Sequence, residues 1–259
     1  MNELSLKKQL TKLNLGEIRY FDSIGSTNDE ALAWAASDAP DLSLVVADEQ
    51  TSGRGRLNRT WRTPPGTSLA ASLILRPTDA QRAYASRMAG LAALAIADAL
   101  TLRGLDAQIK WPNDVLLGGE KVAGILVESV WMGDHADAAI LGMGVNVQQA
   151  AVPPAETLRF PAASVEKYLR CAPDRVKLLY DILASIRAWL PRMDAPSFIK
   201  AWEEKLAFRG ETVYIYEDEQ VSRSGILTGL ESDGSLRLRG ADGNFIAIRA
   251  GDVSLRAGA

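Results

Sequence analysis

A basic loop is the first feature of this sequence that could do chemistry. It lies in "DEQTSGRGRLNRTWRTPPG", residues 48–66, where Gly53 and Gly55 alternate with arginines. No Asp or Glu occurs between positions 50 and 78. Glycine permits unusual backbone angles, and a guanidinium fork suits phosphate or carboxylate, so the loop predicts an anion site. A solvated surface loop is the alternative, and the GxxxxGK[ST] spacing of a Walker A loop is absent from the sequence. The arginines of the loop are Arg54, Arg56, Arg59 and Arg62.

Two lysines and an Asn-Asp pair form the second candidate site. They occur in "IKWPNDVLLGGEKVAGIL", residues 109–126, with Lys110 before the turn and Lys121 after it. If the flanking strands pair as a hairpin, both lysines can approach the same end of a sheet. With two arginines, they and the oxygen ligands Asn113 and Asp114 would suit a polyphosphate and a divalent cation. A hairpin with exposed lysines is the alternative.

Small polar side chains form the third candidate. The stretch "GSTNDEA" contains Ser26, Thr27 and Asn28. A helix over residues 26–37 is predicted to begin there, so these groups could offer donors and acceptors to a small polar head group. The alternative is helix capping, with Thr27 and Glu30 as a capping box.

Two glycines and an asparagine form a fourth and weaker candidate. In "LGMGVNV", Gly142, Gly144 and Asn146 end a predicted strand. The glycines would allow a flat group to approach the backbone closely, or they mark only a bulge.

The composition limits the class of protein. The chain of 259 residues carries 29 Lys+Arg and 32 Asp+Glu, a formal net charge of -3, which argues against a broad nucleic-acid-binding face. Its composition, with one cysteine, Cys171, and one histidine, His135, argues against zinc sites and against mechanisms based on histidine. No signal peptide or apolar run of ~20 residues occurs, so we expect no membrane segment and a cytoplasmic location.

The hydrophobic periodicity predicts an α+β fold, a sheet covered by helices on one side. The predicted strands cover 43–50, 67–77, 107–117 with a break at Pro112, 121–131 and 135–147. The predicted helices cover 26–37, 81–103, 164–170, 174–190 and 196–206. A loop rich in Pro and Ala, residues 148–158, lies between the last strand and the later helices.

The pattern of apolar and polar residues changes after Gly210. Apolar and polar residues alternate, and Asp-Gly pairs at 233–234 and 242–243 indicate hairpins. This pattern predicts a small all-β barrel of about five short strands. We therefore expect two domains, 1–206 and 207–259.

The motifs occur in an order that identifies a family. "GSTNDEA", "DEQTSGRGRLNRTW", "KWPND", "KVAGILVE" and "GMGVNV" follow one another between residues 25 and 147. In this order they resemble the biotin protein ligase, or biotin–[acetyl-CoA-carboxylase] ligase, family. The resemblance implies a class II synthetase-like catalytic domain with a mixed sheet, followed by an SH3-like β-barrel, which agrees with the division drawn above.

The resemblance also implies an ATP-dependent ligase that uses Mg²⁺. The carboxylate of biotin attacks the α-phosphate of ATP, pyrophosphate leaves, and biotinyl-5′-AMP stays bound. A lysine of a biotin carboxyl carrier protein domain then attacks this mixed anhydride. The enzyme needs no covalent nucleophile, so catalysis is positioning and charge stabilisation.

Each candidate residue takes a role by this resemblance. Lys121 would contact the carboxylate and the α-phosphate, and Arg56 would hold the adenylate through its phosphate. Lys110 and Asp114 would support the phosphates and Mg²⁺. The biotin site would comprise Ser26, Thr27, Asn28 and Gln50, together with Arg54, Gly55 and Arg56 of the biotin-binding loop and Lys121.

The nucleotide side of the site is also implied. The residues at ATP would be Asn113, Gly144, Asn146 and Arg256. The loop 148–158 would cover the adenine. Trp61 and Trp111 would pack near the pocket or in the core.

The sequence departs from the family pattern in two places. Many relatives have Arg-Gly where this chain has Leu57 and Asn58, although asparagine tolerates left-handed geometry. Only about 25 residues precede "GSTNDEA", so we expect neither the DNA-binding domain of some relatives nor specific DNA binding. A homodimer through the sheet edge is expected, as in other members.

Three alternatives remain open. One is a lipoate or octanoate ligase on a related fold, which the complete GRGR loop and KWPND disfavour. Another is a nucleic-acid-binding module with a β-barrel tail, which the acidic composition disfavours. The last is a non-catalytic biotin-binding protein, which the presence of Lys110, Lys121 and Asp114 disfavours.

Overall fold

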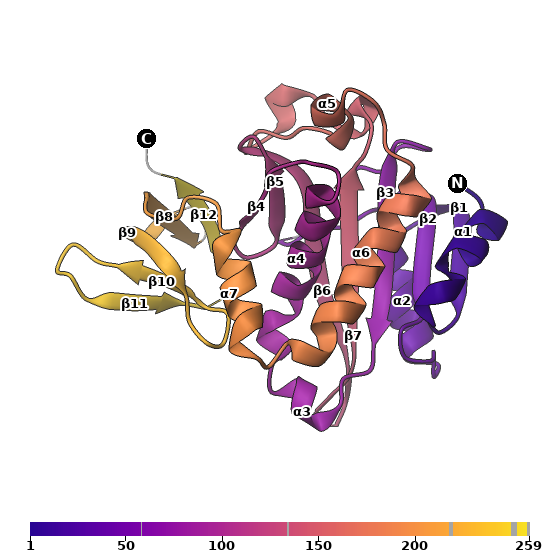
Figure 1. Cartoon of the computed structure of the whole chain (residues 1–259), viewed down its shortest axis with the longest axis horizontal. Coiled ribbons are helices and arrows are strands. Elements are labelled where there is room, and N and C mark those ends of the chain that lie inside the picture. The colour runs from indigo at the N-terminus through magenta and orange to yellow at the C-terminus, as the bar shows by residue number, and fades with distance from the viewer. Residues whose placement is uncertain (58, 134, 218–219, 250–252, 258–259) are drawn as a thin grey trace.

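A seven-stranded mixed sheet forms the larger part of the molecule (Figure 1). The computed structural model describes residues 1–57, 59–133, 135–217, 220–249 and 253–257. The strands of this sheet are β1 (Ile18–Ile24), β2 (Leu44–Gln50), β3 (Ser68–Leu75), β4 (Ala107–Lys110), β5 (Asp114–Leu117), β6 (Glu120–Met132) and β7 (His135–Asn146). They lie in the order β1-β2-β3-β7-β6-β5-β4, where only β1 and β2 pair in parallel. The predicted strands are confirmed except over 107–117, which forms two antiparallel strands, β4 and β5, because the chain reverses at Pro112; β1 was not predicted.

Helices lie on both faces of this sheet. The α-helices are α1 (Glu3–Leu10), α2 (Thr27–Ala35), α3 (Asp79–Arg82), α4 (Met88–Thr101), α5 (Val165–Leu169), α6 (Arg175–Trp189) and α7 (Pro196–Glu204). Short 3-10 turns are η1 (Thr11–Leu13), η2 (Ala85–Arg87), η3 (Gln149–Ala151), η4 (Ala155–Thr157) and η5 (Leu190–Arg192). Among the described residues, no helix is long and apolar enough to cross a membrane.

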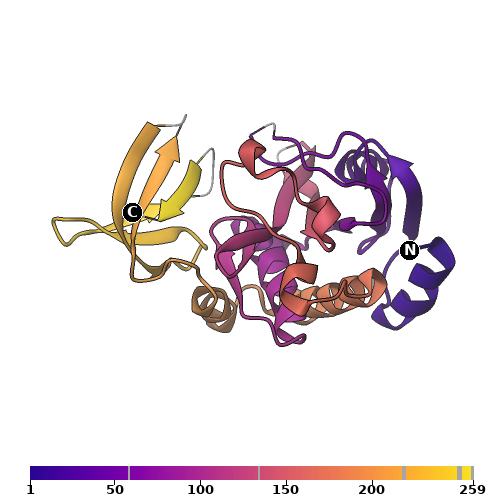
Figure 2. The same cartoon turned by 90° about the horizontal axis from the view of Figure 1, so that it is seen from above.

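The two faces of the sheet bury different sets of side chains. On β3, Leu73 joins the large core beneath α1, α4 and α6, whereas its neighbour Ile74 packs beneath α2 with Trp34. This follows from the period of two along a strand. Figures 1 and 2 show α2 on the side of the sheet opposite α4 and α6. The prediction of helices on one side only was therefore wrong. The second face of the sheet also carries apolar residues, and α2 buries them.

Two details of the predicted helices also need correction. The N-cap of α2 is Ser26, whose hydroxyl accepts the Asp29 N–H, so the predicted capping box of Thr27 and Glu30 is absent; the Glu30 carboxylate pairs with Arg19 instead. The helix predicted over 81–103 is interrupted between α3 and α4 by η2, and ends before Gly104, whose φ is 76°.

A second, five-stranded antiparallel sheet follows α7 (Figure 2). Its strands are β8 (Thr212–Glu217), β9 (Gln220–Leu230), β10 (Leu236–Arg239), β11 (Phe245–Ile248) and β12 (Val253–Ala257), in the order β11-β10-β9-β8-β12. It contacts the larger part of the molecule through polar bonds: the Trp111 indole N–H donates to the Gly234 carbonyl at 3.1 Å, and the Leu230 N–H donates to Glu203 at 3.1 Å. Leu230 and Leu236 also belong to the large core.

Candidate functional site

A row of charged and small residues crosses the sheet on the face that carries α2. The strand register places Lys110 beside Asp114, Asp114 beside Gly124, and Gly124 beside Gly144. Ala70 of β3 continues the row next to Gly144. Two strands, β4 and β5, thus bring charges to one end of the row, and the neighbouring strands β6, β7 and β3 contribute small residues beside them.

Glycine is needed on these strands because other groups lie directly on them. We call Gly124, Gly142 and Gly144 the glycine floor. A Cβ at Gly144 would lie 2.4 Å from the Trp61 indole, and one at Gly142 would lie 2.2 Å from Oδ1 of Asn28. The close approach predicted for "LGMGVNV" is therefore present, and protein side chains make it.

A bulge turns Lys121 onto the same face. On β5 and β6, Val115 is opposite Ala123 but the next residue, Leu116, is opposite Lys121, so the register shifts between them. Bulges of this kind re-aim a side chain. The backbone of Lys121 is also fixed, because its N–H donates to the Pro161 carbonyl at 2.8 Å.

Lys110, Asp114 and Lys121 form an ion cluster at the end of the row. The ammonium of Lys121 lies 2.6 Å from Oδ1 of Asp114, and that of Lys110 lies 3.6 Å from Oδ2. Lys110 is 8% exposed and its ammonium also lies 4.3 Å from the Phe160 ring centroid. The predicted meeting of the two lysines is confirmed.

Burial and charge act in opposite directions on this cluster. Burial lowers the pKa of Lys110, with Asp114 opposing the shift and Lys121 adding to it. Burial alone would raise the pKa of Asp114, but the charges of Lys121 and Lys110 outweigh it and hold that pKa below its usual value. The carboxylate therefore stays ionised between two cations, and the cluster keeps a net positive charge.

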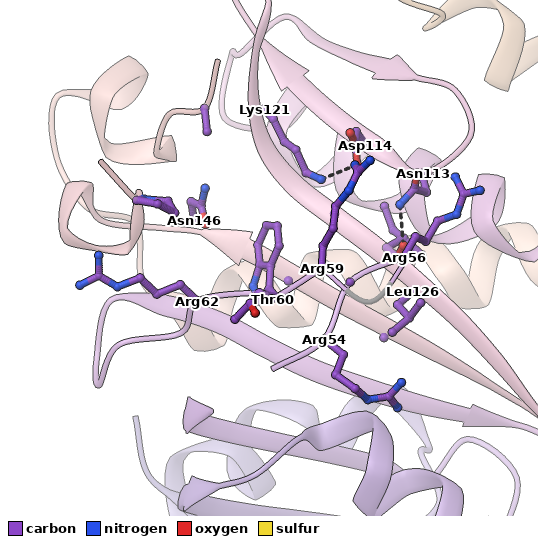
Figure 3. A pocket seen from close by; sticks show the side chains of 18 of the residues that line it. Arg54, Arg56, Arg59, Thr60, Arg62, Asn113, Asp114, Lys121, Leu126 and Asn146 are labelled. Atoms are coloured by element: carbon purple, nitrogen blue, oxygen red, sulfur yellow. Dashed lines mark hydrogen bonds and ion pairs between the residues drawn. The ribbon is translucent and has the colours of Figure 1, made fainter. Parts of the chain in front are cut away.

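The turn between β4 and β5 presents Asn113 to the arginine loop. Its peptide bond Trp111–Pro112 is cis. The Asn113 amide N–H donates to the Ile125 carbonyl at 2.8 Å, which leaves its oxygen to accept from Arg56 at 3.2 Å (Figure 3). Asn113 thus connects the sheet to this arginine.

The basic loop itself folds back as an arm, whose described residues are 50–57 and 59–63, and we call it the arginine arm. Isolated bridges join Gln50 to Thr63 and Arg54 to Thr60, so that the arm has two sides and a tip. At the tip, Leu57 has a φ of 56° and is 43% exposed. Asn58, which was expected to supply left-handed geometry, lies outside the described residues.

The side chains at the start of α2 are linked to the root of this arm. The N–H and hydroxyl of Thr27 contact Oε1 of Gln50 at 2.8 and 3.0 Å, and the Gln50 amide donates to Thr63 at 3.1 Å. Ser26, Thr27 and Asn28 are all buried. They lie together with Gln50 at one end of the site, as predicted.

Arg54 differs from the other arm arginines. Its guanidinium is held by Asp29 at 2.5 Å and by Glu128 at 2.9 and 3.0 Å, and hydrogen bonding to Glu128 raises its pKa despite partial burial. Figure 3 shows it pointing away from Lys121 and Asp114. Arg54 therefore fastens the arm to α2 and β6.

These elements enclose one cavity of about 650 Å³, a size typical of small-molecule sites. Its walls are the glycine floor, the arginine arm, the ion cluster, and residues from 151 to 162 that close the opposite side. Among the described residues that line it, Asp114 is the one acid. The basic residues are Arg54, Arg56, Arg59, Arg62, Lys110, Lys121 and Arg159. The cavity is thus built for a polyanion with an apolar portion.

Comparison with known proteins agrees with this geometry. The model of the biotin/lipoate A/B protein ligase family matches residues 20–146. A biotin–[acetyl-CoA-carboxylase] ligase of Paracoccus denitrificans is 40% identical over 241 residues, which cover 88% of this chain and 96% of that protein. The chain belongs to the biotin protein ligase family.

Further relatives in this family match over nearly the whole chain. The biotin–[acetyl-CoA-carboxylase] ligase of Mycobacterium tuberculosis is 31% identical over 98% of this chain and 95% of its own length. Among solved structures, the biotin protein ligase from Aquifex aeolicus in complex with biotin and ATP has a TM-score of 0.79. It is 28% identical and covers 93% of this chain and 99% of its own.

Sequence reasoning missed some residues of the site. Glu128 was not singled out, although alternation along "KVAGILVE" puts it on the face of Gly124. Arg59 extends from the arm on the side of Asp114 (Figure 3), and its charge helps to lower the pKa of Lys110.

Of the residues predicted at the nucleotide, Asn146 is bonded to the backbone, because its amide donates to the Ala163 carbonyl at 3.2 Å. The side chain of Arg256 lies outside the described residues.

Proposed function

We propose that this chain is an ATP-dependent ligase that converts biotin to biotinyl-5′-AMP and transfers the biotinyl group to a lysine of a biotin carboxyl carrier protein domain. The observation that carries the proposal is the ion cluster Lys110–Asp114–Lys121 at the end of the glycine floor. It supplies fixed positive charge beside a cavity that also has an uncharged polar end. The family and the names of its full-length relatives support the same reaction.

The first step needs stabilisation of charge that develops on phosphorus. The biotin carboxylate oxygen attacks the α-phosphate of ATP, the bond to pyrophosphate breaks, and both products carry negative charge. Lys121, which the bulge turns onto this face, would contact the attacking carboxylate and the α-phosphate. Lys110 and Arg56 then neutralise the remaining phosphate charge. Donors held on strands lose little energy to reorganisation during the reaction, which is why such preorganisation accelerates it.

Mg²⁺ fits this site as an ion carried by the triphosphate. Within the described residues, no group of three or more His, Cys, Asp or Glu side chains could hold a metal by itself. Mg²⁺ usually takes one or two protein carboxylates and completes its shell with phosphates and water. Asp114 and the amide oxygen of Asn113 would hold it here. When bound, it supplies neutralisation of phosphate charge.

The polar end of the cavity suits the head group of biotin. Ser26 and Thr27 present hydroxyls, and Gln50 an amide, next to Asn28, and Gly55 of the arm also lines the cavity. A ureido group has both N–H donors and a carbonyl acceptor, and leaving one such buried partner unpaired costs ~1–3 kcal/mol. This end of the site would therefore set the substrate specificity. The valeryl chain would then extend over the glycine floor toward Lys121.

The nucleotide would occupy the other end. Asn113, Gly144 and Asn146 line the cavity, as do Pro153 and Pro154 of the loop predicted to cover the adenine. Arg256 is kept as a nucleotide contact on the family resemblance alone.

The decisive test is carboxylate-dependent exchange of pyrophosphate with ATP. We expect exchange with biotin that greatly exceeds exchange with lipoate or octanoate. Exchange with lipoate or octanoate instead would identify the alternative ligase, and the absence of exchange with all three would overturn the proposal. Transfer is then tested with a biotin carboxyl carrier domain and its lysine-to-arginine variant as the matched control.

Several features of the whole molecule belong to the same proposal. We propose domains 1–206 and 207–259, with the second sheet closing as an SH3-like barrel, and a class II synthetase-like first domain. We also propose that the protein forms a homodimer, does not bind DNA specifically and is located in the cytoplasm. Residues 205–207 bond to Ile109 of β4 through their backbone, which makes them a natural end for the first domain. The acidic net charge supports the absence of DNA binding.

A further inference from the structure

One carboxylate connects the arginine arm to the polar end of the cavity. Glu128 on β6 accepts the Asn28 amide at 2.7 Å through Oε2, and its two oxygens accept from Arg54 at 2.9 and 3.0 Å. Asn28 and Arg54 are far apart in sequence from Glu128, which lies 100 and 74 positions away. The three side chains therefore form one unit only in the folded protein.

The charge of Glu128 fixes which way the Asn28 amide faces. An ionised carboxylate only accepts, so the NH₂ group must face it. The NH₂ group also donates to the Leu126 carbonyl at 3.3 Å, and Oδ1 then faces the Ser72 hydroxyl at 2.6 Å. Ser72 has one proton, which it gives to Asn28, and it also lies 2.8 Å from the Thr27 hydroxyl, whose own proton goes to Oε1 of Gln50 at 3.0 Å. The orientation of Asn28 thus sets where the Ser72 hydroxyl donates, next to Thr27.

The same carboxylate also fastens the arm. Arg54 has two acidic partners, Asp29 and Glu128, with exposed side-chain fractions of 58% and 24%. Only the less exposed partner, Glu128, also contacts Asn28. A change at Glu128 should therefore disturb both the arm and the polar end, whereas a change at Asp29 should disturb the arm alone and weakly, as expected for an exposed ion pair.

We propose that Glu128 is a positioning residue that couples closure of the arginine arm to the polar arrangement of Thr27 and Asn28. It acts through Arg54 and Asn28 and does not touch the reacting atoms. The arm half of this proposal is a property of the ligand-free protein. The half that concerns affinity for biotin rests on the proposed function.

The arm is tested by tryptic cleavage of the ligand-free protein, followed by mass spectrometry. Glu128→Gln, which keeps the shape and removes the charge, should raise the rate of cleavage within residues 54–62 about fivefold, since local opening becomes easier. Cleavage elsewhere should not change. The matched control Asp29→Asn should change the arm rate by less than about twofold. A Glu128→Gln arm cleaved at the rate of the unsubstituted protein would overturn the coupling.

The polar end is tested by kinetics of pyrophosphate exchange. Glu128→Gln should raise KM for biotin about tenfold, with kcat and KM for ATP changed by less than about twofold. Equal increases in both KM values, or no increase for biotin, would contradict a positioning role. If the unsubstituted protein shows no biotin-dependent exchange, the proposed function fails, while the tryptic comparison still decides whether Glu128 holds the arm.

A swap variant covers the case in which Glu128→Gln does not fold. Asn28→Asp alone puts two carboxylates side by side and should lower the thermal midpoint. Adding Glu128→Gln restores one donor and one acceptor between these positions, so the double variant should recover part of that loss. If the double variant is no more stable than Asn28→Asp, the two side chains do not act as a pair and the proposal fails.

Discussion

The ion cluster and the arginine arm both present positive charge to the cavity, but they are held in different ways. Lys110 and Lys121 stand on strands, beside a carboxylate that both contact, and Lys110 is almost completely buried. The arm lines the cavity with Leu57 exposed near its tip, and Arg54 fastens it by ion pairs that are partly open to solvent.

This difference suggests a division of tasks. Groups that must meet developing charge gain from a rigid support, because they are then in place before the reaction. Groups that must admit a substrate and later keep an intermediate from escaping need to open, and segments with few buried contacts open most easily. Changes in the cluster should therefore reduce the chemical step, and changes in the arm should reduce retention.

The largest effect is expected at Lys121. Lys121→Ala removes the cation nearest Asp114 and the predicted contact to the α-phosphate. We expect the rate of biotinyl-5′-AMP formation to fall by ~10²–10³-fold, the usual loss for one preorganised charge-stabilising group. Single-turnover formation of the adenylate measures it. A loss smaller than about tenfold would remove Lys121 from its central role.

Arg56→Gly should show the opposite pattern. The adenylate should still form, with a rate within about tenfold of the unsubstituted protein, because the lysines remain. Its half-life on the enzyme should shorten by on the order of a hundredfold, as expected when a charged hydrogen bond to the phosphate is lost. Separation of free from bound adenylate by rapid filtration measures this. An Arg56→Gly protein that retains its adenylate normally would show that the arm does not hold the phosphate.

Gly144→Ala should damage the floor by overpacking. The added methyl would lie 2.4 Å from the Trp61 indole, so the ring must move into the cavity. We expect a loss of about 1–3 kcal/mol in the free energy of unfolding and a rise in KM for biotin. Gly25→Ala is the matched control, because a Cβ there meets no atom within 4 Å. Equal effects in the two variants would contradict the close-packed floor.

The pH dependence should be the smallest effect and reports on Lys110. Its pKa in the folded protein is lowered from 10.5 by burial. The folded protein therefore loses this proton at a lower pH than the unfolded chain does. As the pH is raised, the adenylation rate should begin to decline before pH 10.5 is reached, because the Lys110 cation is lost. Lys110→Arg keeps its charge at these pH values, so the decline should move to higher pH. The same decline in both proteins would exclude Lys110 as its cause.

Local sequence patterns predicted the strands and the ion cluster well. Lys110 on β4 and Lys121 on β6 lie on either side of β5, so antiparallel pairing of consecutive strands was enough to bring both to Asp114. The strand β1 was missed because "IRYFDSI" is a half-exposed edge strand whose charged residues interrupt the alternation. The break between α3 and α4 was missed because the residues around η2 have no Gly or Pro to mark it.

The polar connections of the site could not be predicted in the same way. Arg54 was expected to contact substrate, because an arginine in a glycine-rich loop predicts an anion but not which one. Its partner Glu128 lies 74 positions away, and the contact depends on strand order, which periodicity does not give. The contacts of the Ser72 hydroxyl with Thr27 and Asn28 also join residues that are distant in sequence, so they were not predicted either. Side chains that join elements distant in sequence require the three-dimensional structure.

The central claim is that the cluster makes the adenylate and the arm keeps it. One single-turnover experiment with biotin and labelled ATP tests it, by measuring total and enzyme-bound biotinyl-5′-AMP over time in three proteins. We predict abundant bound adenylate in the unsubstituted protein, little of either kind in Lys121→Ala, and abundant but mostly released adenylate in Arg56→Gly. Normal formation in Lys121→Ala, or tight retention in Arg56→Gly, would contradict the account.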